Sequence, residues 1–114
     1  MELPSFPEWT EDTLEERATR AGRPVLVVFW SEPGTPADAL APVLEAVAQE
    51  FAGRAAFAQV KVGRSPGRVP ALKLGGTPTV AVFDGPALVE QRAGAAPLWV
   101  YREMLERALV AYTA

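Results

Sequence analysis

Val25-Leu26-Val27-Val28-Phe29-Trp30 is the stretch of sequence that decides the fold. All six residues are apolar, and five of them are β-branched or aromatic. A continuous apolar run of this kind, without alternating polar residues, predicts a central β-strand that is covered on both faces. Arg23-Pro24 leads into this strand, and Ser31 to Gly34 are expected to form the loop that follows it.

A helix is predicted directly after this loop. Thr35 is suited to cap its N-terminus and Pro36 to its first position, while Gly53 is a fitting end. Pro42 falls inside the helix and is expected to kink it. The buried stripe of the helix is predicted from apolar residues at helical spacing, which are Leu40, Val43, Leu44, Val47 and Phe51.

The remaining elements complete one α/β domain over residues 1–114. Pro4 and Pro7 limit residues 1–9 to a weakly ordered segment or an edge strand, and a first helix is expected from near Thr10. Arg64 to Leu74 is expected to give only distorted helical turns. The other predicted elements are strands over 56–62, 79–83 and 87–92, a hairpin turn at Asp84-Gly85, and a last helix after Pro97. Together they predict a mixed central sheet flanked by helices on both faces.

The composition excludes several kinds of chemistry. The chain has neither cysteine nor histidine, which removes disulfides, thiolate nucleophiles, imidazole bases and the metal sites that these side chains build. A net charge of -3 argues against nucleic acid as the main partner. No apolar run is long enough for a membrane helix, and the N-terminus lacks a signal core, so a cytoplasmic protein without membrane contact is expected.

Basic residues dominate one part of the chain. No acidic residue lies between Glu50 and Asp84, whereas that interval contains five cations: Arg54, Lys61, Arg64, Arg68 and Lys73. Two interpretations stay open, which are ordinary scatter of surface charge and a basic face for an acidic partner.

The order of these elements, with their residues, resembles the thioredoxin family from about Thr10 to Leu109. The first segment that carries the resemblance is the central strand with Ser31-Glu32 after it. The second is the helix segment Leu40-Ala41-Pro42-Val43-Leu44-Glu45. The others are Ser65-Pro66, Thr77-Pro78-Thr79, Phe83-Asp84-Gly85 and Arg92-Ala93-Gly94. The resemblance implies a thioredoxin fold in which the Thr77–Pro78 bond is cis.

The departures from the family pattern concern its redox site. Where the family has Cys-Gly-Pro-Cys, this chain has Gly34, Thr35, Pro36 and Ala37, so the positions of the lost cysteines are Gly34 and Ala37. Pro33 replaces the aromatic residue before the motif. Val28 replaces the family's buried acid, and Gln59 replaces the lysine near that acid.

The resemblance implies a shallow peptide-binding groove around the altered motif. Its predicted members are Pro33, Gly34, Thr35, Pro36, Thr77, Pro78, Ala93 and Gly94. Thr35 is interpreted as a helix cap, and Glu32 and Asp38 as charges at the helix start. No catalytic residue, metal ligand or cofactor is predicted. Trp30 is expected in the core, and Trp9 and Trp99 are expected to be partly exposed.

Three functions follow from this reading. The first is a redox-inactive module that binds a protein or peptide as a chaperone-like or adaptor domain, without enzymatic activity. The second is an enzyme that binds glutathione or another thiol, or that borrows a partner's cysteine. The third is a structural subunit that forms a homodimer.

Overall fold

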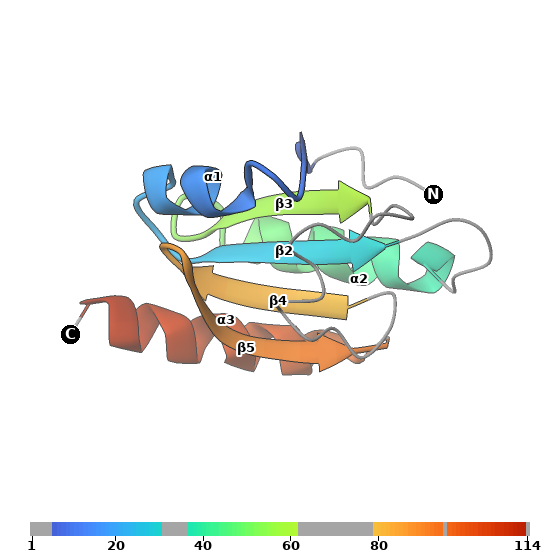
Figure 1. The fold of residues 1–114 in the computed structure, drawn as a ribbon. Coiled ribbons are helices and arrows are strands. Elements are labelled where there is room, and N and C mark those ends of the chain that lie inside the picture. The colour runs from blue at the N-terminus through green and yellow to red at the C-terminus, as the bar shows by residue number, and fades with distance from the viewer. Residues whose placement is uncertain (1–5, 31–36, 62–78, 95, 114) are drawn as a thin grey trace.

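A five-stranded sheet in the order β1-β3-β2-β4-β5 forms the middle of the protein (Figure 1). The computed structural model describes residues 6–30, 37–61, 79–94 and 96–113. The strands are β1 (Glu8–Trp9), β2 (Val25–Trp30), β3 (Ala56–Lys61), β4 (Thr79–Asp84) and β5 (Ala87–Ala93). β1, β3 and β2 run parallel to one another, whereas β4 and β5 are antiparallel to their neighbours.

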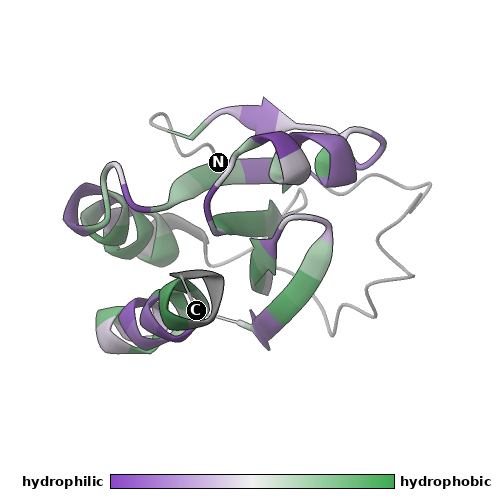
Figure 2. Ribbon diagram, turned by 90° about the vertical axis from the view of Figure 1, so that its left-hand side faces the viewer, coloured by the Kyte–Doolittle hydropathy of each residue, from purple (hydrophilic) through white to green (hydrophobic). Residues whose placement is uncertain are grey.

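Helices cover both faces of this sheet, which confirms the predicted fold class. They are α1 (Leu14–Arg20), α2 (Ala37–Glu50) and α3 (Leu98–Thr113). In Figure 2 the sheet lies between α1 on one side and the pair of α2 and α3 on the other. The parallel strands β3 and β2 and the antiparallel hairpin of β4 and β5 together form the mixed sheet that the sequence predicts.

β2 is the central strand, as its apolar run predicts. Every residue from Val25 to Trp30 is buried. The strand pairs along its full length with β3 on one side, and from Val25 to Phe29 with β4 on the other. Its alternate side chains therefore face two different apolar clusters, which explains why no polar residue interrupts the run.

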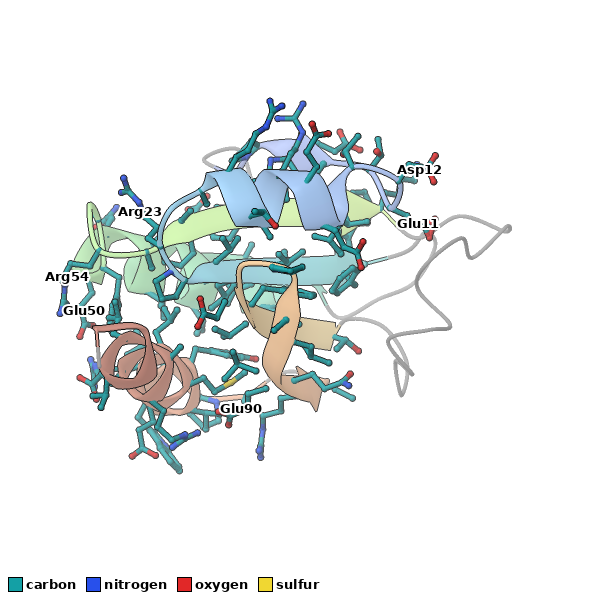
Figure 3. The ribbon with its side chains drawn as sticks, turned by 60° about the vertical axis from the view of Figure 1, so that its left-hand side comes forward. Glu11, Asp12, Arg23, Glu50, Arg54 and Glu90 are labelled. Carbon is teal, nitrogen blue, oxygen red and sulfur yellow. The ribbon has the colours of Figure 1, made fainter. Side chains whose placement is uncertain are left out.

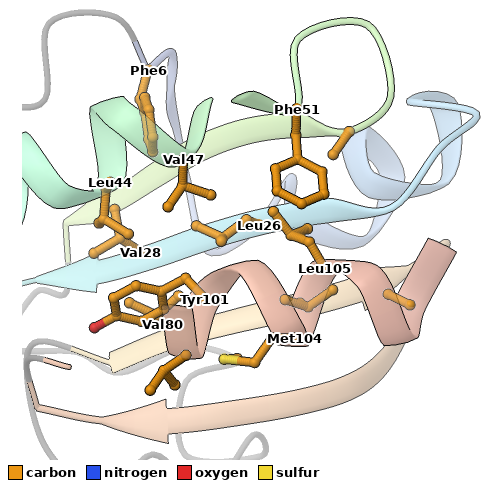
Figure 4. Close-up of a cluster of buried hydrophobic side chains, with 14 of the residues drawn as sticks. Phe6, Leu26, Val28, Leu44, Val47, Phe51, Val80, Tyr101, Met104 and Leu105 are labelled. Carbon is orange, nitrogen blue, oxygen red and sulfur yellow. The ribbon is translucent and has the colours of Figure 1, made fainter. Parts of the chain in front are cut away.

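The larger of these clusters lies between the sheet and the two long helices. Leu26 and Val28 of β2 meet Leu44 of α2, Phe51 directly after α2, and Tyr101 of α3 there (Figure 4). Burial of large aliphatic and aromatic side chains stabilises a domain by about 1.5–3 kcal/mol for each residue. This face therefore contributes most of the packing energy of the fold.

The smaller cluster lies between the sheet and α1. Val25, Val27 and Phe29 of β2 pack there against Leu14 and Ala18 of the helix. Trp9 also belongs to this cluster and is only 9% exposed. The expectation that Trp9 lies partly at the surface is therefore wrong, because α1 and the sheet cover its ring. Trp99 is exposed and Trp30 is buried, as expected.

The first helix begins later than its sequence pattern suggests. Residues 11–13 form a turn, and α1 starts only at Leu14. Thr10 and Thr13 stabilise this turn, since the Thr13 amide donates to the Thr10 carbonyl at 3.2 Å and the two hydroxyl groups lie 2.9 Å apart. Threonine side chains that bond to nearby groups in this way compete with a continuous helix.

The second and third helices lie close to their predicted positions. Four residues of the predicted stripe are buried, Leu40, Leu44, Val47 and Phe51, whereas the fifth, Val43, is only partly buried. Pro42 lies inside α2, and Gly53 after the helix adopts a φ of +83°, which glycine tolerates without strain. Arg64 to Leu74, where distorted helical turns are expected, lies outside the described residues.

Candidate functional site

The predicted groove lies only partly within the described residues. Ala93 and Gly94 are described, and α2 begins at Ala37, one of the two positions where the family has cysteine. The other predicted members lie outside the described residues, namely Pro33, Gly34, Thr35, Pro36, Thr77 and Pro78. The cis form of the Thr77–Pro78 bond, the capping role of Thr35 and the position of Glu32 therefore stay predictions.

The register of the sheet places Ala93 near the carboxyl end of β2. Thr79 at the start of β4 pairs with Phe29 on one side and with Ala93 on the other. Gly94 follows with a φ of +78°. Apart from its chain neighbours, no described residue has an atom within 4 Å of the position that a Cβ would take there.

Val28 and Gln59 are direct neighbours across the β2–β3 ladder. These are the two positions where the family resemblance implies a buried acid and a lysine. Val28 is fully buried in the larger apolar cluster, and Gln59 is 4% exposed. An ionised carboxylate at position 28 would lose its hydration, which is costly. The neutral side chains of Val28 and Gln59 avoid that cost.

The Gln59 amide is hydrogen-bonded at both ends. Its Oε1 accepts from the Trp30 indole Nε1 at 3.0 Å, and its Nε2 donates to the Phe6 carbonyl at 3.0 Å. Lys61 lies near the same indole, with Nζ 5.6 Å from the ring centroid. The amide thus connects β2, β3 and the segment before β1. Sequence reasoning missed this bridge, although a single glutamine between the apolar residues of a buried strand is the signal that points to one.

Glu11 is the one ionisable residue with a covered, unpaired oxygen among the described side chains. Its Oε2 atom is shielded from solvent and has no hydrogen-bond partner there, while the residue as a whole is half-buried. Figure 3 shows Glu11 and Asp12 beside the start of α1. Desolvation raises the pKa of the Glu11 carboxyl above its ordinary value, and the neighbouring charge of Asp12 adds to the rise.

The described residues offer few groups for chemistry near the carboxyl end of β2, where the predicted groove lies. Within it, no group of three or more His, Asp and Glu side chains is placed to hold a metal ion. None of its helices has the length and apolar character that a membrane crossing requires. At this end of the sheet, β2 is followed in the chain by the 14-residue helix α2.

The sequence of this chain is similar to that of a known protein family. The family model described as Thioredoxin matches residues 5–107. A thioredoxin of Acidithiobacillus ferridurans is 33% identical over 86 residues, which cover 75% of this chain and 80% of that protein. A thioredoxin of Allochromatium vinosum is also 33% identical, over the same shares of both chains. A chloroplastic thioredoxin M4 of Arabidopsis thaliana is 30% identical over 96% of this chain and 55% of that protein.

These relatives contradict two predictions made from the sequence. The chain was expected to be a redox-inactive binding module and not to be an enzyme. The reported relatives are all named thioredoxin, the name of a family of thiol–disulfide oxidoreductases, and none of these names describes an adaptor or chaperone. The prediction gave the six replaced positions of the motif and its surroundings more weight than the similarity to proteins named thioredoxin, which extends over 75% of the chain or more.

Proposed function

Because the chain belongs to the thioredoxin family, we propose that it promotes thiol–disulfide exchange between two other molecules that bring their own sulfur atoms. The observation that carries the proposal is the family match over residues 5–107. The chain itself has no cysteine, so its contribution is to hold the reacting sulfurs in place. Correct placement of two reactants is by itself a large source of rate enhancement.

The exchange that we propose has two steps. One thiolate of an external dithiol attacks the substrate disulfide, which forms a mixed disulfide and releases the first substrate thiolate to take up a proton. The second thiolate of the dithiol then attacks the mixed disulfide, which closes the oxidised reagent and releases the second substrate thiol. The dithiol loses two electrons and the substrate disulfide gains them.

Two features of the chain and one further proposal support a role for the edge between β2 and α2 in this exchange. The positive end of the α2 dipole favours a thiolate over a thiol. Gly34 and Ala37, at the two lost cysteine positions, both have side chains smaller than cysteine. A cytoplasmic location, which we also propose, would keep such external thiols reduced.

The test is a disulfide reduction assay with insulin as the disulfide and dithiothreitol as the dithiol. We expect the rate to exceed that of dithiothreitol alone and to rise in proportion to protein concentration. The matched control combines Gly34→Cys with Ala37→Cys, which gives the same scaffold its own pair of thiols and should be far faster. A parent rate equal to dithiothreitol alone, beside an active double variant, would overturn the proposal.

A further inference from the structure

Two exposed cations flank the carboxyl end of β2, one on each side of it. Lys61 is the last residue of β3 and pairs with Trp30, the last residue of β2. Arg92 lies near the end of β5 and pairs with Val80, which pairs in turn with Val28 of β2. In Figure 1 the arrowheads of β3, β2 and β5 point toward the same side of the molecule. Both cations therefore lie at the end of the sheet where the candidate site is placed.

The two cations also project from the same face of the sheet. Residues that pair directly across two strands, and residues two apart along one strand, project to one face. Val28 and Val80 belong to the larger cluster, which faces α2 and α3. Trp30 lies two residues after Val28, so Trp30 and its partner Lys61 project to this face. Arg92 projects to it as well, because it pairs with Val80.

A chain of contacts keeps the Lys61 ammonium group near the end of β2. Its Nζ atom lies 5.6 Å from the centroid of the Trp30 ring, which is within the range of a cation–π interaction. The ring is held in turn, because its Nε1 donates to Oε1 of Gln59 at 3.0 Å and Nε2 of Gln59 donates to the Phe6 carbonyl at 3.0 Å. Trp30 directly precedes the segment that contains the altered motif. The ammonium group thus has a fixed aromatic support beside the candidate site.

Arg92 supplies the second charge, from the other side of β2. Its side chain is exposed and makes no hydrogen bond or ion pair with another described residue. Burial raises the pKa of the Tyr101 hydroxyl group on α3, and the positive charge of Arg92 opposes that rise. The guanidinium charge therefore acts on the face that α3 covers. Three strand spacings separate β3 from β5, so the backbones of the two cations are about 14 Å apart.

The acidic residues near this end of the sheet are placed differently. Glu11 and Asp12 follow β1 at the same end, but they lie beside α1 on the opposite face (Figure 3). Glu8 on β1 lies two residues before the level of Lys61. An anionic group that approaches the end of β2 along the face of α2 and α3 therefore meets the two cations first.

We propose that Lys61 and Arg92 make acidic polypeptides the preferred disulfide substrates of the exchange described under the proposed function. The inference rests on that exchange, because it names the substrate class of the same site. An extended chain covers about 14 Å with about four residues, so carboxylates on both sides of a disulfide reach both cations. Opposite charges in this arrangement mainly speed the encounter of substrate and protein.

Two disulfide peptides that differ only in their flanking residues test the proposal. One has glutamates on both sides of an internal disulfide, and the other has lysines at the same positions. The measured quantity is the acceleration by the protein over dithiothreitol alone, because flanking charge also changes the reactivity of the disulfide itself. At low salt the acidic peptide should be accelerated about fivefold more than the basic peptide. This ratio should fall toward one in about 0.5 M sodium chloride, because salt screens the charges.

Substitutions assign the preference to the two cations. Lys61→Gln and Arg92→Gln should each lower the ratio about twofold, and the double variant should bring it close to one. Lys61→Arg should keep the ratio, since arginine has the same charge and also binds to aromatic rings. Arg20→Gln is the matched control, because Arg20 is an exposed cation in the last turn of α1, at the amino end of the sheet. It should leave the ratio unchanged.

Equal acceleration of the two peptides by the parent protein would overturn the inference. The same holds if Arg20→Gln lowers the ratio as much as Lys61→Gln does, because net charge alone would then explain the preference. If the parent accelerates neither peptide, the proposed exchange is wrong, and the protein with Gly34→Cys and Ala37→Cys decides the inference. A preference for the acidic peptide in that protein, lowered by Lys61→Gln, supports the role of the cations, and equal rates contradict it. Circular dichroism of each variant separates a lost preference from a lost fold.

Discussion

The two faces of the sheet differ in how completely their helices close them. The face under α2 and α3 is sealed by helices of 14 and 16 residues, and its buried amide, Gln59, is bonded at both ends. The face under α1 has a helix of only 7 residues. That face leaves a groove of about 440 Å³, and Glu11 near the start of its helix has an unpaired oxygen.

This difference teaches that helix length decides where the molecule keeps open surface. Two long helices bury nearly all of the apolar residues on one face, so that face contributes stability. One short helix covers only part of the other face and leaves a groove beside it. Residues on the two faces are thus expected to differ in how much they contribute to stability, and four substitutions in three tests examine that division.

The largest effect is expected from a charge on the sealed face. Val28→Asp would place a carboxyl group in the larger cluster, at a fully buried position. Burial would raise the pKa of this carboxyl by about three units, which corresponds to a loss of about 4 kcal/mol in the free energy of unfolding at pH 7. The loss should shrink as the pH falls through the raised pKa, because the protonated form is less costly to bury.

Urea unfolding between pH 4 and pH 7 measures this effect. Val28→Thr is the matched control, because it adds a neutral hydroxyl group of similar size and its cost should not vary with pH. A Val28→Asp protein as stable at pH 7 as at pH 4 would show that water reaches this face and that it is not sealed.

A pair of leucine truncations compares the faces directly. Leu44→Ala on α2 should cost about 3–5 kcal/mol, because the residue is fully buried between long helices that cannot close the cavity. Leu14→Ala on α1 should cost about 2–3 kcal/mol, because a short helix beside an open groove can move inward. Equal costs in urea unfolding would contradict the division between the faces.

The smallest effect is expected at Glu11, and its sign is the informative part. The raised pKa of this carboxyl means that the folded state disfavours its ionised form. Its destabilising contribution is present above the raised pKa and disappears below the ordinary carboxyl pKa. Glu11→Gln should therefore stabilise the protein by about 0.5 kcal/mol at pH 7 and by less at pH 4.

The control for this substitution is Glu8→Gln, since Glu8 is an exposed carboxylate on the adjacent edge strand. It should leave the free energy of unfolding nearly unchanged at both pH values. Destabilisation by Glu11→Gln at pH 7 would mean that the ionised carboxylate has a partner that stabilises it.

The sequence predicted the architecture well because its apolar patterns are strong. The run from Val25 to Trp30 and the stripe of α2 depend on local spacing, and both lie where expected. The start of α1 was misplaced because two threonines three residues apart bond to each other, which no periodicity reveals. The burial of Trp9 and the Gln59 bridge depend on residues about fifty positions apart in the chain.

The candidate site was harder to predict from the sequence than the fold. Pairing of Ala93 with Thr79 follows from the hairpin, and the sequence contains the signals for that hairpin. The groove between α1, β1 and the start of β3 was not predicted, because its lining residues come from segments that lie far apart in the chain. Only the crossing of α1 over β1 and β3 brings them together.

The two edge strands of the sheet affect how readily molecules pair with one another at high concentration. β1 offers a neighbouring molecule only two residues, and Pro7 directly before it has no N–H to donate. On the other side, β5 pairs with β4 through a register shift in which Val89 is the extra residue. A strand that bends at such a bulge is a poor template for another chain. Concentrated solutions should therefore resist fibre formation through the sheet edges, without any need for a dimer to cover them.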